Sequence, residues 1–211
     1  MGKVRVGKQE MNNKFQTLDD RQPYILAITG ASGAIYAKTL IAYFYQHNLP
    51  LICLATRVGK KVWEWEMGVS LEKALPTSVS LYEEDDWWAP VASGSVKAKG
   101  MVVMPCSMGT LAAIAHGLSR NLIQRTADVM LKERHPLIIV PRETPLHAMH
   151  LENMLFLTRL GAIILPAMPA FYHRPKDIQD LANFVVARVL DHLGLPHTLI
   201  PSWKEMANIE A

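Results

Sequence analysis

Two short segments of this 211-residue sequence combine glycine with hydroxyl side chains immediately after an apolar run. The segment GASG (30–33) follows the apolar run 24–29, and SMGT (107–110) follows the run 100–105. Backbone N–H groups at the start of a helix bind anions such as phosphate. A glycine-rich turn that only makes room for packing has the same sequence, so one such segment is a weak signal. Two of them favour a phosphorylated cofactor such as a mononucleotide.

Neither segment carries one of the better-known nucleotide fingerprints. A dinucleotide-binding loop would need glycine at positions 32 and 35, where Ser32 and Ile35 stand, and the lysine of a P-loop is absent. His147 and His150 have the spacing of two metal ligands but no third ligand near them in the sequence. Cys106 lies in an apolar run, which fits a small buried thiol better than a nucleophile.

Apolar runs and the longer segments between them predict the scaffold that positions these groups. The runs are YILAIT (24–29), LPLICLAT (49–56), GMVVMP (100–105), PLIIVP (136–141) and AIILPA (162–167). Near-continuous apolar runs are typical of parallel strands covered by helices on both faces. We expect helices at about 33–46, 58–67, 108–117, 120–134, 147–160 and 175–193, and a loop-rich excursion over 68–99. The alternation predicts a single α/β domain with a doubly wound parallel sheet.

The segments that follow the expected strands carry many hydroxyl, charged and proline residues. Besides 29–34 and 104–110, they are ATRVG (55–59), VPRETP (140–145) and LPAMPAFY (165–172). In open α/β sheets, ligands bind outside the carboxyl ends of the strands, where the strand order reverses. The sequence therefore predicts a small-molecule site at that edge of the sheet.

Composition and charge limit the classes of function. The formal net charge is +3 without a dense Lys/Arg cluster, which argues against nucleic-acid binding. No apolar run is long enough for a transmembrane helix, and the first residues lack the apolar core of a secretory signal. Because Cys53 and Cys106 lie in apolar segments, we expect reduced thiols and a cytoplasmic protein. Residues 1–22 are expected to be a flexible extension, 23–202 the folded domain and 203–211 a tail.

Six motifs taken together resemble those of one family. They are GASGA (30–34), PCSMGTL (105–111), NLIQRTADVMLKERHPL (121–137), PRETPL (141–146), HLENM (150–154) and PAFYHRP (169–175). In this order, over about residues 22–202, they resemble the UbiX-type flavin prenyltransferases, once described as aromatic-acid or polyprenyl-hydroxybenzoate decarboxylases. The resemblance implies a Rossmann-like (flavodoxin-like) fold, bound FMN, no metal, and a homododecamer with its sites at subunit contacts.

The resemblance also implies a reaction and the residues that carry it. The dimethylallyl group of dimethylallyl monophosphate joins N5 and C6 of reduced FMN, and the prenylated FMN so made serves a UbiD-type decarboxylase. The FMN contacts carried over to this sequence are Gly30, Ala31, Ser32, Thr56, Ser107, Met108, Gly109, Thr110 and Arg142. The resemblance assigns Ser32 and Glu143 as an acid–base pair near the leaving phosphate and N5, and Glu66 as a carboxylate that acts in ring closure.

A second set of residues is carried over as the binding site of the prenyl donor. The set is Lys132, Tyr172, Arg188 and Arg125 for the phosphate, and Trp87, Ser93 and Gly94 for the wall of the prenyl pocket. Fixed cations in a dry site stabilise a departing phosphate well. Arg125 and Lys132 are two helical turns apart and so project from one face. The acidic run 83–86 lacks the spacing of a metal-binding pair, which is consistent with a monophosphate donor bound by cations.

Simpler interpretations of these residues stay open. Arg125 with Asp128, and Arg188 with Asp191, have the i,i+3 spacing of ordinary intrahelical ion pairs. Two other functions stay open as well. One is an FMN-dependent cysteine decarboxylase of the phosphopantothenoylcysteine or lantibiotic type, although PCSMGT (105–110) stands where such enzymes carry a PASANT-like motif. The other is a non-catalytic flavin-binding module, which would not need several donor-binding residues around one anion.

Overall fold

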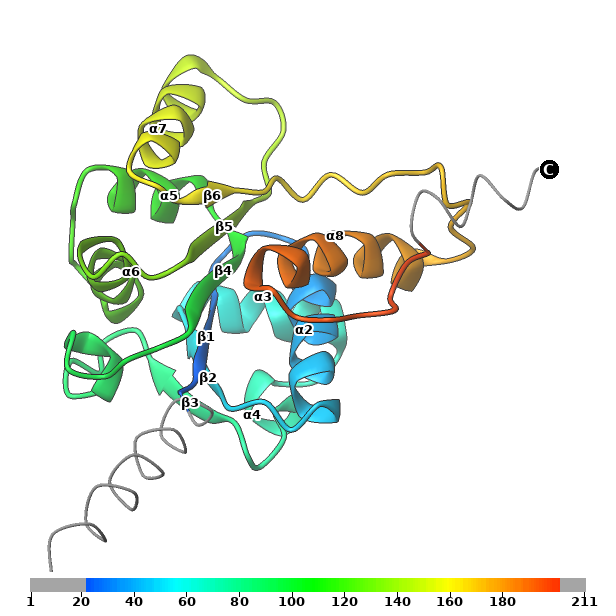
Figure 1. Cartoon of the computed structure of the whole chain (residues 1–211), viewed down its shortest axis with the longest axis horizontal. Coiled ribbons are helices and arrows are strands. Elements are labelled where there is room, and N and C mark those ends of the chain that lie inside the picture. Colours follow the sequence, from blue (N-terminus) through cyan, green and yellow to red (C-terminus); the bar gives the residue numbers. More distant parts are fainter. Residues whose placement is uncertain (1–21, 202–211) are drawn as a thin grey trace, which may run out of the picture.

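Parallel strands form one central sheet in the computed structural model, which describes residues 22–201 (Figure 1). The strands are β1 (Tyr24–Ile28), β2 (Leu51–Ala55), β3 (Ser80–Glu83), β4 (Gly100–Cys106), β5 (Leu137–Pro141) and β6 (Ile163–Ile164). Their order across the sheet is β3-β2-β1-β4-β5-β6, and every neighbouring pair is parallel. The predicted doubly wound, flavodoxin-like α/β fold is confirmed.

Helices cover both faces of this sheet. They are α2 (Ala34–Gln46), α3 (Arg57–Met67), α4 (Leu71–Ala74), α5 (Met108–Ala115), α6 (Leu122–Lys132), α7 (Ala148–Arg159) and α8 (Ile178–Leu193), with the short 3-10 helix η1 (Pro90–Ala92). Figure 1 shows α2, α3 and α8 on one side of the sheet and α5, α6 and α7 on the other. Alternate residues of β1 therefore pack into two separate cores. Leu26 and Ile28 belong to one core, and Ile25 and Ala27 belong to the other. Burial of each large aliphatic side chain stabilises the fold by about 1.5–3 kcal/mol.

The strand order reverses between β1 and β4. The chain runs from β1 outward through β2 to β3, and then returns to the other side of β1 with β4. The helices that follow β1 and β4 therefore leave the sheet on opposite faces, which is the arrangement that creates a ligand site in open α/β folds. Residues 29–33 and 107–110 follow these two strands and lie at this point.

Two regions of the chain differ from the sequence prediction. The segment 68–99, expected to be rich in loops, contains the edge strand β3 together with α4 and η1. An edge strand that is half exposed needs no continuous apolar run, so the sequence of β3 carries only a weak strand signal. The last helix begins at Ile178 and not at Pro175, because the Asp177 side chain accepts a hydrogen bond from Asp180 N (2.9 Å) and caps the first turn.

Two surfaces of the chain expose apolar side chains. Residues 165–177, here called the arm, connect β6 to α8, and Figure 1 shows them running away from the sheet. Met168, Phe171 and Tyr172 on the arm are exposed. The second surface, here called the α7 face, consists of Met149, Leu151, Leu155, Phe156 and Leu160. Exposed apolar groups gathered in this way mark contact surfaces.

Three further sequence expectations concern membrane-spanning helices, metal sites and the two ends of the chain. No helix within residues 22–201 is long and apolar enough to cross a lipid bilayer. In the same range, no three His, Cys, Asp or Glu side chains lie close enough together to hold a metal ion. The expected extension (1–22) and tail (203–211) lie outside the described residues, except for Gln22.

Candidate functional site

The hydroxyl of Thr29 joins the two glycine-containing segments at the carboxyl edge of the sheet. It donates a hydrogen bond to Pro105 O (2.9 Å) and accepts one from Ser107 N (2.7 Å). Thr29 is 1% exposed, so its hydroxyl is shielded from water. Because a buried N–H that loses its acceptor costs about 1–3 kcal/mol, these bonds are hard to replace. Thr29 therefore fixes the end of β1 against the start of α5.

A carboxylate from α3 closes the N-terminus of α2. Glu66 accepts hydrogen bonds from Gly33 N (3.0 Å) and Ala34 N (2.7 Å). The positive end of the helix dipole favours an anion at this position. The anion that GASG binds in this structure is thus the chain's own Glu66, and these two N–H groups are engaged before any ligand arrives.

Several contacts keep Glu66 ionised. Burial raises the pKa of its carboxyl, but hydrogen bonds from the Ser32 hydroxyl and the α2 backbone, with the charge of Arg142, lower it by more, and the net shift is downward from 4.5. Glu66 is therefore a carboxylate near neutral pH, able to accept a proton. The structure brings Ser32, Glu66 and Arg142, three predicted site residues, into one cluster.

The start of α3 packs directly against the end of β1. Thr56 caps α3 by accepting a hydrogen bond from Gly59 N (2.9 Å). A Cβ on Gly59 would lie 2.6 Å from Ile28 O, and one on Gly30 would lie 2.6 Å from Val58 Cγ1. Only glycine permits such close approaches. The predicted FMN contact Thr56 is thus held beside the GASG segment.

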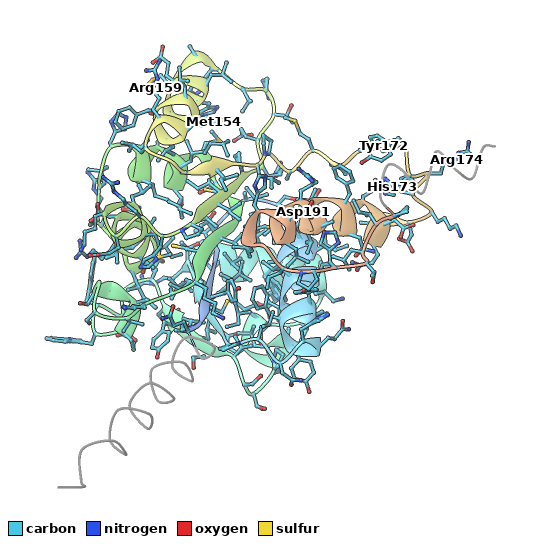
Figure 2. The ribbon with its side chains drawn as sticks, in the orientation of Figure 1. Met154, Arg159, Tyr172, His173, Arg174 and Asp191 are labelled. Atoms are coloured by element: carbon cyan, nitrogen blue, oxygen red, sulfur yellow. The ribbon has the colours of Figure 1, made fainter. Side chains whose placement is uncertain are left out.

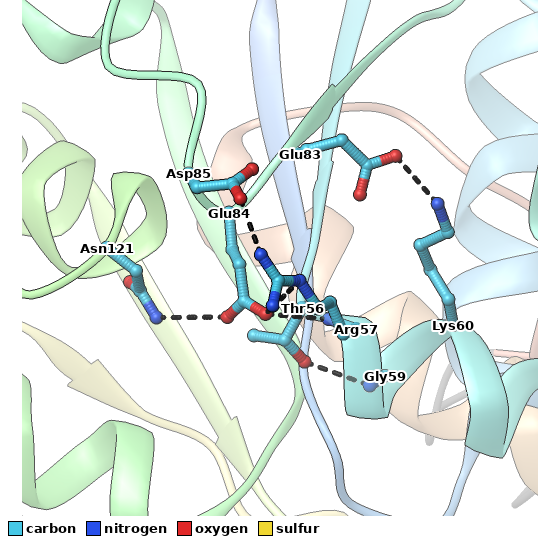
Figure 3. Close-up of polar contacts among 8 residues, drawn as sticks. All are labelled: Thr56, Arg57, Gly59, Lys60, Glu83, Glu84, Asp85 and Asn121. Atoms are coloured by element: carbon cyan, nitrogen blue, oxygen red, sulfur yellow. Dashed lines mark hydrogen bonds and ion pairs between the residues drawn. The ribbon is translucent and has the colours of Figure 1, made fainter.

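The acidic run anchors the start of α3 from the outside, as Figure 3 shows. Glu84 Oε1 accepts a hydrogen bond from Arg57 N (3.0 Å), and its Oε2 accepts one from Asn121 Nδ2 (3.5 Å). Glu83 pairs with Lys60 (2.7 Å). These carboxylates therefore tie the starts of α3 and α6 together and are engaged with donors of the chain itself.

The start of α5 is a second helix N-terminus at this edge. The Ser107 hydroxyl donates to Thr110 Oγ1 (3.1 Å) and accepts from Thr110 N (3.4 Å). A Cβ on Gly109 would meet no atom within 4 Å, so the space beside this turn is open. The first N–H groups of a helix have no partner within the helix. This end of α5 therefore fits a phosphate, whereas the side chain of Met108 is buried in the core.

The loop after β5 brings a cation to the same edge. Arg142 Nε donates to Ser32 O (3.1 Å), and Arg142 N donates to Cys106 O (3.2 Å). Arg142 thereby connects the ends of β5, β4 and β1. The next residue, Glu143, is exposed and accepts a hydrogen bond from Thr144 N (3.0 Å). Its carboxylate is accessible beside the cluster.

Arg125 fastens α6 to the short helix η1. Its Nε donates to Ala92 O (3.1 Å), and its Nη1 pairs with Asp128 (2.8 Å). The ordinary intrahelical ion pair that the spacing allows is therefore present, together with a longer-range contact. Arg125 holds the segment that carries the predicted wall of the prenyl pocket.

Lys132 lies at the end of the same helix, against that segment. It pairs with Glu133, and a Cβ on Gly94 would lie 3.1 Å from Lys132 Nζ. Ser93 adjoins Gly94, and Trp87 is half exposed in the same excursion. The structure thus gathers the α6 part of the predicted donor site around residues 87–94.

Tyr172 and Arg188 line a different cavity from Lys132. They line one of about 1120 Å³ beside α8, whereas Lys132 lines one of about 870 Å³ between α5, α6 and α7. Figure 2 shows Tyr172 on the arm, well away from Met154 and Arg159 on α7. Arg159 also lines the Lys132 cavity. The predicted phosphate-binding residues therefore do not meet within one chain.

Comparisons with known proteins place the chain in a family. The Flavoprotein family model matches residues 12–190. The flavin prenyltransferase UbiX of Alkalihalophilus pseudofirmus is 47% identical over 190 residues, which cover 85% of this chain and 95% of that protein. This chain belongs to the UbiX flavin prenyltransferase family. The UbiX flavin prenyltransferase of Methanocaldococcus jannaschii is 48% identical over 179 residues, covering 85% of this chain and 97% of that protein.

Solved structures of UbiX proteins have the same fold. AnUbiX in complex with FMN and dimethylallyl pyrophosphate gives a TM-score of 0.82 at 39% identity, covering 87% of this chain and 97% of its own. A dodecameric FMN-dependent UbiX-like decarboxylase from Escherichia coli O157:H7 gives a TM-score of 0.82 at 40% identity, covering 86% of this chain and 99% of its own. A PPC decarboxylase mutant gives a TM-score of 0.58 at 22% identity, covering 74% of this chain and 86% of its own. This is a likeness of fold alone. The cysteine decarboxylase alternative is therefore less favoured.

Two residues of this cluster carry no distinctive signal in the sequence. Thr29 is a polar residue at the end of an apolar run, a signal that was available but is shared by many strand ends. Tyr36 lies on α2 beside the cluster, where its ring would contact a Cβ on Gly33 at 2.8 Å. Gly33 has φ 115°, a backbone conformation that favours glycine. Only the fold shows that Tyr36 covers this turn.

Glu66→Gln should lower the free energy of unfolding by about 1–2 kcal/mol at pH 7, because it removes the charge at the N-terminus of α2. The pKa of Glu66 is lowered in the folded state, so its stabilisation is present above 4.5 and is lost as the pH falls through the folded-state value. Urea unfolding of both proteins over a pH series measures the difference. Glu64→Gln, an exposed change on the same helix, serves as control. A difference that stays constant down to about pH 3 would contradict the assignment.

Proposed function

We propose that this chain transfers a dimethylallyl group from a prenyl phosphate to reduced FMN. The observation that carries the proposal is the meeting of GASG, Arg142 and the open start of α5 at one sheet edge, in a chain of the UbiX family. In this reaction the C–O bond of the donor breaks, phosphate leaves, and the allylic carbon bonds to flavin N5. Flavin N5 loses its proton in this step. The remaining alkene then gains a proton at its CH carbon, its dimethyl-substituted carbon bonds to flavin C6, and C6 loses its proton.

The FMN phosphate is proposed to bind at the start of α5, with Thr56 and Ser107 to Thr110 around it. Two N–H groups at the N-terminus of α2 are already engaged by Glu66, so a second anion there would meet a carboxylate. The open space beside Gly109 supports the choice of α5. The remaining contacts, from Gly30, Ala31, Ser32 and Arg142, would then face the flavin ring.

Ser32, Glu66 and Glu143 are proposed to move the protons. Glu66 is ionised and hydrogen-bonded to Ser32, which supports a role as acceptor of the C6 proton when the carbon–carbon bond forms. Glu143 follows Arg142 and is exposed, so it can exchange a proton with the leaving phosphate. The two carboxylates thus have different environments and different tasks.

The phosphate of the donor is proposed to bind between subunits. Lys132 lies in one cavity and Tyr172 with Arg188 in another, so two copies are needed to bring them together. The exposed arm and the exposed α7 face supply apolar surface for such a contact. The relative from Escherichia coli O157:H7 is described as dodecameric, which supports a homododecamer here.

Cationic side chains, without a metal ion, are proposed to neutralise the donor phosphate. Glu83 and Glu84 are engaged with Lys60, Arg57 and Asn121, so the acidic run serves the fold. Arg and Lys offer fixed charge and several donors to phosphate oxygens. Dimethylallyl monophosphate is the proposed donor, and the pyrophosphate named for AnUbiX is the alternative that an assay must compare.

The product has a proposed destination. Prenylated FMN is a modified cofactor, and we propose that a UbiD-type decarboxylase receives it. A cytoplasmic location is proposed as well, since Cys53 and Cys106 are both buried and unpaired, as in a reducing compartment.

Anaerobic incubation with reduced FMN and dimethylallyl monophosphate tests the proposed function. Mass spectrometry of the released flavin should show FMN with one added C5 unit, and the yield should not change with EDTA. The pyrophosphate donor and oxidised FMN serve as comparisons. An unmodified flavin with both donors would contradict the proposal, and activity that EDTA abolishes and Mg²⁺ restores would contradict its metal-free form.

Glu143→Gln should keep the fold and FMN binding but lose most of the turnover. General acid–base groups contribute about 10²–10⁴-fold to rate. If Glu143 acts as its carboxylate, the acid limb of the wild-type pH–rate profile should be missing in the variant. A loss below about threefold, or an unchanged acid limb, would assign the titration to another group.

Lys132→Ala and Arg188→Ala should each abolish turnover, and mixed oligomers of the two should regain it. In a random mixture, about a quarter of the contacts pair an intact Lys132 with an intact Arg188, if these belong to different subunits of a symmetric assembly. Co-expression with two affinity tags isolates the mixed oligomers. No regained activity in them would show that both residues act within one chain.

A further inference from the structure

The carboxylate of Asp191 on α8 is shared by two side chains. Its Oδ2 accepts a hydrogen bond from Arg188 Nη1 (2.5 Å), and its Oδ1 accepts one from His197 Nε2 (3.0 Å). An ionised carboxylate only accepts hydrogen bonds, so the proton in the second contact lies on Nε2. All three residues line the cavity beside α8 that also contains Tyr172. His197, Asp191 and Arg188 thus form a continuous series of contacts that ends in the proposed donor site.

The backbone after α8 fixes the position of His197. Leu195 N donates to Leu190 O (3.0 Å), which turns the chain back at the end of the helix. The Tyr43 hydroxyl donates to Pro196 O (2.6 Å) and ties the turn to α2. The two residues before His197 are therefore fixed by contacts that do not involve its ring nitrogens.

His197 is much less exposed to solvent than Arg188 and Asp191. Its side chain is 10% exposed, whereas those of Arg188 and Asp191 are 49% and 42% exposed. The other ring nitrogen of His197, Nδ1, is buried and has no hydrogen-bond partner among residues 22–201. Within that range, the single hydrogen bond of this imidazole is therefore the one to Asp191.

An exposed Arg–Asp pair alone fixes little, because water competes for both groups and both side chains lose rotamer freedom. A bond from His197, which is mostly buried, to Asp191 restricts this freedom. The bond from His197 holds one carboxylate oxygen, so the other is fixed toward Arg188. A guanidinium has five N–H donors, and Asp191 engages Nη1, which leaves donors to bind an anion in a fixed orientation.

We propose that His197 is a positioning residue for the donor phosphate, acting through Asp191 on Arg188. The proposal rests on the proposed function, since it takes Arg188 as a ligand of that phosphate. His197 does not touch the substrate. Its removal leaves Arg188 charged and present but free to rotate, so donor binding weakens while FMN binding at the other end of the site does not change.

The test compares donor binding with FMN binding in the assembled protein. His197→Phe keeps the ring shape and removes the hydrogen bond. Donor affinity is measured by calorimetry with dimethylallyl monophosphate on the oxidised FMN complex, because the proposed reaction needs reduced FMN and so cannot start there. The dissociation constant of the donor should rise about fivefold to thirtyfold, somewhat less than for loss of a direct hydrogen bond to a charged group, because His197 acts through Asp191. That of FMN should stay within about twofold.

A double-mutant cycle distinguishes positioning from a structural role. Arg188→Gln should itself weaken donor binding, and in that background His197→Phe should have no further effect. His192→Phe, an exposed change on the same helix, is the matched control and should leave both dissociation constants unchanged. His197→Gln, which retains an N–H donor, should recover most of the donor affinity.

Each other outcome overturns a defined part of this account. Equal weakening by His197→Phe with and without Arg188 shows that the imidazole acts by another route, and no weakening shows that it does not act at all. If Arg188→Gln leaves donor affinity unchanged, the assignment of Arg188 fails and the role of His197 fails with it. Should His197→Phe not fold, Asp191→Asn takes its place, and donor affinity equal to that of the wild type contradicts the proposal.

Discussion

One buried hydroxyl holds together the edge of the sheet on which the site depends. Thr29 directly follows β1, and its hydroxyl binds both Pro105 O and Ser107 N, so one side chain joins the loops that follow the paired strands β1 and β4. Separately, Arg142 adds the end of β5, and the close approach of Gly59 to Ile28 O adds the start of α3. Four loops far apart in the sequence thereby become one surface.

The Glu66 carboxylate and a bound phosphate would compete for the helix N-termini on that surface. Helix N-termini favour negative charge, and Glu66 occupies that of α2. The flavin phosphate is therefore proposed to bind at the start of α5, where Gly109 leaves space. The cations proposed to bind the prenyl phosphate, Lys132 and Arg188, line two different cavities of the chain, so the proposed chemistry depends on assembly. In the second of these cavities, the nearly buried His197 bonds to Asp191 and can thereby fix the exposed ion pair of Asp191 with Arg188.

The sequence predicts what depends on local pattern and misses what depends on contacts between distant segments. Buried parallel strands such as β1 and β4 are continuous apolar runs, and both were found, whereas the half-exposed β3 was not. The resemblance named Glu66, but its bonds to Gly33 and Ala34 span more than thirty residues and carry no local signal. The link from His197 through Asp191 depends in the same way on how the chain turns after α8.

The dissociation constant of FMN for Thr29→Val tests most directly whether this hydroxyl organises the site. Valine keeps the shape of threonine but cannot bind Pro105 O or Ser107 N, so the start of α5 loses its fixed position. The constant should rise about tenfold, the equivalent of one hydrogen bond. Thr126→Val is the matched control, since it removes a buried hydroxyl that donates to Leu122 O within α6 and to Val91 O in η1, neither of which lies in the loops after β1 and β4, and it should leave FMN binding unchanged. FMN affinity in Thr29→Val equal to that of the wild type would contradict the account.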